Sequence, residues 1–322
     1  MLQKVFILGA GPAGMSAALW LRNLGFEPIV AESESESGGM QRLNFLKNNW
    51  ILGSESTTGV DLASVHRAHL ETLDIPVLTE ASTKVDVSAQ GVKIDVLRRG
   101  SIQRSFEALA IIIATGTRFR SHEYVSKIAG WGSLLSSTVF FGPFAFSKLA
   151  LTGQSEVLIL GGGDNAFENA KILRDLGCRV TIVCRSNPKA QRKLVESVRA
   201  NHPGSGVELF CESAVVNVIR LEEKVEVRLR SGKEQIFRRV SRIHVLYGYE
   251  PNVSFLKNWS FTSSSPLALD SAGYVVVESG QRTSVNGVYA AGDVCNPNYP
   301  SVITALAQGA IAAKSIEMDS RC

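Results

Sequence analysis

Residues 5–14 read Val5-Phe6-Ile7-Leu8-Gly9-Ala10-Gly11-Pro12-Ala13-Gly14, and a helix-like stretch follows from Met15 to Leu24. The apolar run predicts a buried strand, and the pattern G-x-G-x-x-G predicts a tight turn between that strand and the helix. In such a turn the first glycine permits the bend, the second lets a pyrophosphate approach the backbone, and the third lets helix and strand pack closely. The helix N-terminus then faces the anion, so this stretch predicts a dinucleotide site.

An acidic residue ends the next predicted strand. Residues 28–31 form a short apolar run, and Glu32 follows it, eighteen residues past Gly14. A carboxylate at this point accepts hydrogen bonds from a ribose diol. The plain alternative is a glycine-rich turn with a surface glutamate.

The same unit recurs 152 residues later. Residues 157–166 read Val157-Leu158-Ile159-Leu160-Gly161-Gly162-Gly163-Asp164-Asn165-Ala166 and overlay residues 5–14. The equivalent of Glu32 is Cys184, which Arg185 follows, with further cations at Lys189, Arg192 and Lys193. Arginine accommodates a ribose 2′-phosphate that an acid would repel, so the second unit favours NADP(H) over NAD(H). A solvated basic helix is the alternative reading.

Composition limits the class of protein. The chain has 322 residues, of which 45% are hydrophobic and 20% charged, with a net charge of +4, which is typical of a soluble globular protein and gives no sign of nucleic-acid binding. The five cysteines include no Cys-x-x-Cys pair, which argues against a disulfide-stapled secreted scaffold and a cysteine-rich zinc site. No apolar run approaches the ~18 residues of a membrane helix. We therefore expect a cytoplasmic protein with reduced thiols and no membrane contact.

Two apolar strands mark the expected domain boundaries, at residues 109–114 and 243–247. They predict an α/β protein with two Rossmann-like three-layer domains, in which a discontinuous first domain (1–117 and 245–322) receives an inserted second domain (118–244). The inserted segment carries 20 basic and 12 acidic residues, a net of +8, and the remainder carries 14 and 18, a net of −4. This asymmetry supports the division.

A further motif lies near the C-terminus, where Gly292 and Asp293 follow an apolar strand and precede a predicted helix from about Val302 to Glu317. An aspartate at this point can bind a ribityl hydroxyl, and the helix N-terminus can stabilise negative charge on a reduced flavin. The alternative is an aspartate that only caps a turn.

Together these motifs resemble the low-molecular-weight thioredoxin reductase family of FAD/NAD(P)H flavoproteins. The resemblance rests on the two glycine turns, Gly38-Gly39 with Asn49-Trp50, Ala114-Thr115-Gly116, residues 248–252 and residues 283–294. It implies FAD in the first domain and NADPH in the second. The implied FAD contacts are Gly9, Gly11, Pro12, Ala13, Gly14, Glu32, Gly39, Asn49, Val85, Ala114, Thr115, Gly116, Gly292, Asp293, Ser301, Val302 and Ile303. The implied NADPH contacts are Gly161, Gly163, Asp164, Asn165 and Arg185, with Lys189 or Arg192 as substitutes for the family's second arginine, which is Ser186 here.

The chain departs from the family at the redox dithiol. Where relatives carry Cys-x-x-Cys, it reads Gly142-Pro143-Phe144-Ala145. Without two thiols there is no internal disulfide relay, so thioredoxin reduction by that mechanism is excluded. Cys178 and Cys184 bracket one predicted strand and lie ~20 Å apart, beyond disulfide reach. Cys295 and Cys322 are the remaining, weaker candidates for redox chemistry or intermolecular pairing.

Three functions remain open. The first is an NADPH-linked flavin oxidoreductase that passes electrons to an acceptor without a dithiol, with an acidic carrier such as ferredoxin as a candidate, because cysteine-free relatives include ferredoxin–NADP reductases. The second is a ferredoxin-linked flavoenzyme that has lost NADPH use, and the third is a non-catalytic FAD-binding sensor or scaffold. A small-molecule acceptor above the flavin is also open, unless Phe140, Phe141 and Phe144 fill that space. The resemblance further implies a homodimer.

Overall fold

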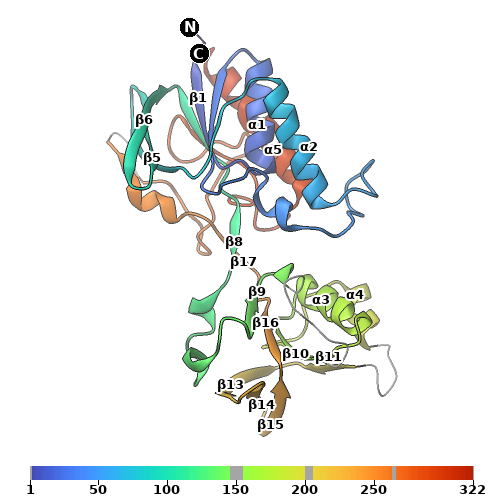
Figure 1. The fold of residues 1–322 in the computed structure, drawn as a ribbon. Helices are drawn as coiled ribbons and strands as arrows, with labels where there is room; N and C mark the ends of the chain where they lie inside the picture. Colours follow the sequence, from blue (N-terminus) through green and yellow to red (C-terminus); the bar gives the residue numbers. More distant parts are fainter. Residues whose placement is uncertain (1, 146–154, 200–205, 263–265, 322) are drawn as a thin grey trace. The chain divides into compact units, whose positions relative to one another are not determined.

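The computed structural model describes residues 2–145, 155–199, 206–262 and 266–321. The chain divides into two compact units, Met1–Arg118 with Glu250–Cys322, and Phe119–Tyr249 (Figure 1). Each unit contains a parallel sheet packed against helices and a second sheet, which is antiparallel except where Trp259–Phe261 pairs in parallel with Val85–Val87 in the first unit. The predicted class, two Rossmann-like domains with the second inserted into the first, is confirmed. Cys322 lies outside the described residues.

The second domain boundary, where the chain returns to the first unit, lies a few residues later than the expected 244/245. Val245 ends strand β16 (Arg242–Val245) and pairs with Leu160 and Phe141 inside the second unit. Residues up to Tyr249 therefore belong to the second unit. Strands β8 (Thr117–Phe119) and β17 (Tyr249–Pro251) pair with each other where the chain passes between the units.

The parallel sheet of the first unit has the strand order β19-β7-β1-β2-β3. These strands are β1 (Lys4–Leu8), β2 (Glu27–Ala31), β3 (Val77–Leu78), β7 (Ala110–Ile113) and β19 (Val288–Ala290). Both faces of the sheet are buried. Val5 and Ile7 face one hydrophobic cluster, whereas Phe6 and Leu8 face the other, as the two-residue period of a strand requires. The near-continuous apolar runs seen in the sequence follow from this double burial.

Helices cover one face of this sheet and a second sheet covers the other (Figure 1). The helices are α1 (Pro12–Asn23), α2 (Gly59–Thr72) and α5 (Val302–Asp319), and the short 3-10 helix η1 (Gly39–Leu43) precedes α2. Helix α5 closes tightly on α1, because a Cβ added at Gly309 would lie 2.1 Å from the carbonyl oxygen of Ala13. The opposite sheet contains β18 (Trp259–Phe261), β4 (Ser82–Ser88), β5 (Gly91–Arg98) and β6 (Ser101–Ala108) in that order.

The second unit repeats this plan. Its parallel sheet has the order β12-β11-β10-β16-β9 and comprises β9 (Val139–Phe141), β10 (Glu156–Leu160), β11 (Arg179–Val183), β12 (Val207–Phe210) and β16. Helices α3 (Asp164–Asp175) and α4 (Arg192–Arg199) accompany it, with an antiparallel sheet of β13 (Ser213–Arg220), β14 (Val225–Ser231) and β15 (Glu234–Val240). In neither unit do the described residues include a helix with the length and apolar character needed to cross a membrane.

Candidate cofactor site

The first glycine turn is built as the sequence predicts, at the carboxyl end of β1. The Gly9 N–H donates to the Ala31 carbonyl at 2.8 Å, and Gly9 has a φ of +107°. A Cβ at Gly9 would lie 2.4 Å from the Ala114 carbonyl oxygen, and one at Gly14 would lie 1.9 Å from the Gly9 carbonyl oxygen. The turn therefore tolerates no side chain at either position. Gly11 is the N-cap of α1, and Pro12 occupies its first turn, where a missing N–H costs nothing.

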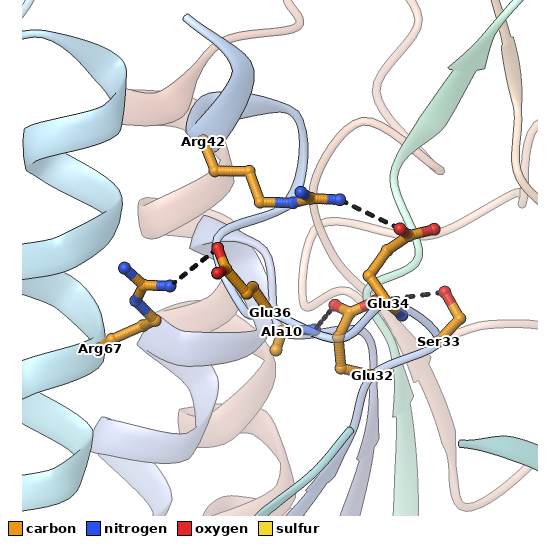
Figure 2. A network of polar contacts seen from close by, with 7 residues as sticks. All are labelled: Ala10, Glu32, Ser33, Glu34, Glu36, Arg42 and Arg67. Carbon is orange, nitrogen blue, oxygen red and sulfur yellow. Dashed lines mark hydrogen bonds and ion pairs between the residues drawn. The ribbon is translucent and has the colours of Figure 1, made fainter. Parts of the chain in front are cut away.

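Glu32 folds back onto this turn (Figure 2). The Ala10 N–H donates to Glu32 Oε2 at 2.9 Å, and the Glu34 N–H donates to Glu32 Oε1 at 3.0 Å. The side chain is almost fully buried, at 7% exposure. These bonds hold the carboxylate beside the turn, where the sequence predicts a ribose diol. Ribose binding itself stays a prediction.

The acids that follow Glu32 turn outward instead. In Figure 2, Glu34 pairs with Arg42 at 3.1 Å, and Glu36 pairs with Arg67 at 3.4 Å. Both carboxylates are largely exposed, so each ion pair contributes only a few tenths of a kcal/mol up to about 1 kcal/mol. Their effect is to hold the segment after β2 against η1 and α2.

Gly39 brings η1 against the glycine turn. The Gly38 N–H donates to the Ala10 carbonyl at 2.8 Å, and a Cβ at Gly39 would lie 3.1 Å from Gly11 Cα. The structure thus gathers Gly9, Gly11, Gly39 and Ala114, which lie far apart in the sequence, around one turn.

Two buried polar atoms near this turn have no hydrogen-bond partner among the described residues. They are Oγ1 of Thr115, which follows Ala114, and Oδ1 of Asp293. Burial raises the pKa of Asp293 to about 6. Asp293 is held near helix α1, since a Cβ at the preceding Gly292 would lie 2.8 Å from Ala13 Cβ. Because buried polar groups are normally satisfied, both atoms are open to hydrogen bonds from a ligand, and the ribityl hydroxyl predicted for Asp293 is a suitable donor.

The remaining predicted FAD contacts are placed as follows. Ser301 caps helix α5 by accepting the Thr304 N–H at 3.1 Å, so Val302 and Ile303 form its first turn. Asn49 is exposed between η1 and α2, and Val85 is buried in β4 at 2% exposure. Their contacts with a flavin or an adenine stay predictions.

The second glycine turn has a different environment. A Cβ at Gly161 would lie 2.3 Å from the Leu246 carbonyl oxygen, whereas one at Gly163 would meet nothing within 4 Å. In place of the folded-back carboxylate, the Cys184 thiol donates to the Gly161 carbonyl at 3.3 Å. The Lys189 N–H donates to the Gly162 carbonyl at 2.8 Å, and this bond holds the loop that follows β11 against the turn.

The predicted NADPH residues differ in how they are held. Asp164 accepts the Gln191 N–H at 2.7 Å, and Asn165 Nδ2 donates to the Tyr249 hydroxyl at 3.1 Å. The Arg185 guanidinium lies over the Tyr247 ring, 5.2 Å from its centroid. Arg192, predicted as a substitute phosphate ligand, pairs with Glu196 at 2.6 Å within α4. This ion pair offsets part of its charge.

The Gly142–Ala145 turn follows strand β9. Gly142 has a φ of +89°, and a Cβ there would lie 2.6 Å from the Phe119 ring. His244, fully buried in β16, donates from Nε2 to the Gly142 carbonyl at 2.7 Å. Burial lowers the pKa of His244, although this hydrogen bond opposes the shift. Sequence reasoning missed this contact, and the signal for it was a histidine inside the apolar run 243–247.

No disulfide bond joins the four described cysteines to one another. Cys178 and Cys184 are buried on either side of β11, and burial raises the pKa of Cys178. Burial together with the neighbouring Asp293 carboxylate raises the pKa of Cys295 to about 12. A thiol with such a pKa stays protonated at neutral pH and is a poor nucleophile.

Two glycine turns on parallel sheets, the first beside a buried carboxylate and unpaired polar atoms, define a two-domain dinucleotide-binding protein. The pyridine nucleotide-disulphide oxidoreductase family matches residues 3–309, and the chain belongs to that family. Thioredoxin reductase of Rickettsia prowazekii is 27% identical over 317 residues, which are 97% of this chain and 96% of that protein. Thioredoxin reductase 2 of Arabidopsis thaliana is 27% identical over 326 residues, and the match covers 98% of this chain and 81% of that protein.

Solved structures of similar fold support the same family. The thioredoxin reductase of T. acidophilum superposes with a TM-score of 0.83 at 25% identity and covers 99% of this chain and 100% of its own. The bacillithiol disulfide reductase Bdr of Bacillus cereus has a TM-score of 0.75 at 17% identity, with 99% and 100% covered, which shows a shared fold alone. The thioredoxin reductase-like family uses FAD and NADPH, and this chain is a flavoprotein oxidoreductase of that kind.

Proposed function

We propose that this chain is an NADPH-dependent flavin oxidoreductase whose electron acceptor is not a protein dithiol. The observation that carries the proposal is the sequence Gly142-Pro143-Phe144-Ala145 at the position of the family's redox pair, in a chain with no Cys-x-x-Cys. The tight contact between Gly142 and the Phe119 ring supports it, because a side chain at 142 would have to displace that ring. The high pKa of Cys295 argues against that thiol as a substitute.

The proposal assigns FAD to the first unit and NADPH to the second. In the first unit, the glycine turn and the N-terminus of α1 bind the pyrophosphate, Glu32 orients a ribose, and Asp293 and Thr115 hold the ribityl chain. Bound FAD supplies the two-electron chemistry. The residues of this chain bind and orient the cofactor, and none of them is required as an acid or a base.

An acidic electron carrier such as ferredoxin is the partner that the charge favours. Residues 118–244 carry a net charge of +8, which would steer an acidic protein toward this unit at low ionic strength. Replacement of the family's second arginine by Ser186 favours a second candidate, in which ferredoxin alone reduces the flavin. We further propose a cytoplasmic homodimer, as in the family.

One experiment tests these assignments together. Purified protein is mixed anaerobically with NADPH, NADH or reduced ferredoxin, and the loss of visible flavin absorbance is followed. NADPH is expected to bleach the flavin faster than NADH does. Bleaching by ferredoxin alone would select the second candidate, and failure of all three donors would leave the FAD-binding sensor or scaffold. NADPH-dependent reduction of thioredoxin would overturn the proposal that the acceptor lacks a dithiol.

A further inference from the structure

The Arg185 guanidinium is stacked on an aromatic ring that the glycine motif does not include. Its central carbon lies 5.2 Å from the centroid of the Tyr247 ring. Arg185 comes two residues after the end of β11, and Tyr247 two residues after the end of β16. The two strands lie on either side of β10, which leads into the second glycine turn. The stacked pair therefore forms where a dinucleotide meets the sheet.

The residues that precede Arg185 and Tyr247, which are Cys184 and Leu246, contact that turn or the end of its strand. The Cys184 thiol donates to the Gly161 carbonyl at 3.3 Å, and the Leu246 N–H donates to the Leu160 carbonyl at 2.7 Å. A Cβ at Gly161 would lie 2.3 Å from the Leu246 carbonyl oxygen. Arg185 and Tyr247 each follow a residue that touches the turn, which fixes where both side chains begin.

Two other polar side chains of this loop are engaged elsewhere. Arg192 pairs with Glu196 at 2.6 Å, and the Ser186 hydroxyl donates to the neighbouring Asn187 carbonyl at 3.3 Å. Lys189 is exposed, and its backbone N–H is the group that contacts Gly162. Arg185 pairs with no carboxylate within the described part of the chain, so its charge is available to a ligand.

We propose that Tyr247 is a positioning residue that holds Arg185 for the ribose 2′-phosphate and thereby sets the preference for NADPH over NADH. This inference rests on the proposed use of NADPH. An arginine loses rotamer freedom when it binds a phosphate, and stacking on Tyr247 restricts that freedom beforehand. Arg185 is exposed, and the N–H edge of a guanidinium held over an aromatic face binds phosphate oxygens in pairs.

The test compares two probes on the full-length, FAD-loaded protein by calorimetry. Adenosine 2′,5′-bisphosphate carries the 2′-phosphate, and adenosine 5′-monophosphate lacks it. Wild type is expected to bind the bisphosphate more tightly. Tyr247→Leu is expected to weaken bisphosphate binding about three- to tenfold and to leave monophosphate binding unchanged. The matched control Tyr247→Phe, which keeps the ring, should stay within about twofold of wild type.

A second variant leaves the partly buried Tyr247 in place. Arg185→Lys keeps the charge but removes the planar group, so a severalfold loss of bisphosphate affinity is expected. The inference is overturned if Tyr247→Leu keeps wild-type bisphosphate affinity, or if it weakens both probes equally. A wild-type protein with no preference for the bisphosphate would overturn the proposed use of NADPH itself. If wild type prefers the bisphosphate and Tyr247→Leu keeps that preference, only the role of Tyr247 is overturned.

Discussion

The two glycine turns of this molecule share a backbone plan and differ in what holds them. In the first unit, the buried Glu32 carboxylate folds back and accepts the Ala10 N–H. In the second unit, the Cys184 thiol occupies the equivalent position and donates to the Gly161 carbonyl, which leaves Arg185 stacked on Tyr247. Two adjacent positions at the end of the second strand thus change the charge beside the turn from negative to positive, since Glu32-Ser33 in the first unit corresponds to Cys184-Arg185 in the second. The glycine motif alone does not distinguish the two sites.

The largest expected effect concerns Gly14, the third glycine of the first turn. Gly14 packs so closely that an added Cβ would lie 1.9 Å from the Gly9 carbonyl oxygen. Gly14→Ala should therefore destabilise the first unit by about 3 kcal/mol or more and prevent FAD retention. Gly163→Ala in the second turn is the control, because its Cβ would meet nothing within 4 Å. Urea unfolding and flavin content are the measurements, and equal losses for the two variants would contradict the prediction.

Glu32→Ala tests the folded-back carboxylate. The change leaves the buried Ala10 N–H without its acceptor, so we expect a loss of about 2 kcal/mol in the free energy of unfolding. Glu34→Ala is the matched control, since Glu34 is exposed and pairs only with Arg42 at the surface. Its expected cost is below about 1 kcal/mol. Chemical denaturation of both variants measures the difference, and a Glu34→Ala cost equal to that of Glu32→Ala would refute the structural role of Glu32.

Local signals account for what the sequence could predict. Both strand–turn–helix units were predictable because apolar runs, glycines and the residue at the second strand end lie within about thirty positions of each other. The contact between His244 and Gly142 was not, because it joins residues 102 positions apart and depends on how β16 pairs with β9. The stacking of Arg185 on Tyr247 depends in the same way on the order of strands in the sheet.

The second domain boundary also depends on strand pairing and could not be placed from the sequence. Residues 243–247 are a single apolar run, and nothing in that run marks where the chain leaves one sheet. Pairing of Val245 with Leu160 keeps it in the second unit. Only the pairing of strands in the folded chain shows that residues 245–249 belong to the second unit and not to the first.

Asp293 gives the first unit a pH dependence. Burial raises its pKa to about 6 in the folded state, above the ~3.9 of an unfolded chain. The folded apoprotein therefore binds this proton more tightly, and its stability should fall as pH rises from about 4 to 6 and then level off. We expect about 1 to 2 kcal/mol after allowing for partial exposure. In the FAD-free protein, Asp293→Asn should remove this slope in urea unfolding between pH 4 and 8. A slope that survives the substitution would assign the proton to another group.

The smallest expected effect concerns the thiol that replaces the folded-back carboxylate. Cys184 is 3% exposed, its sulfur would lie 3.2 Å from a Cβ at Gly162, and it donates to the Gly161 carbonyl. Cys184→Ala removes a small apolar group and a weak hydrogen bond, so the unfolding free energy should fall by about 1 kcal/mol. Cys211→Ala, at a partly exposed position, should cost less than about 0.5 kcal/mol. If Cys184→Ala is neutral in urea unfolding, the sulfur does not support the second turn. The comparison would then reduce to the carboxylate in the first unit and the arginine in the second.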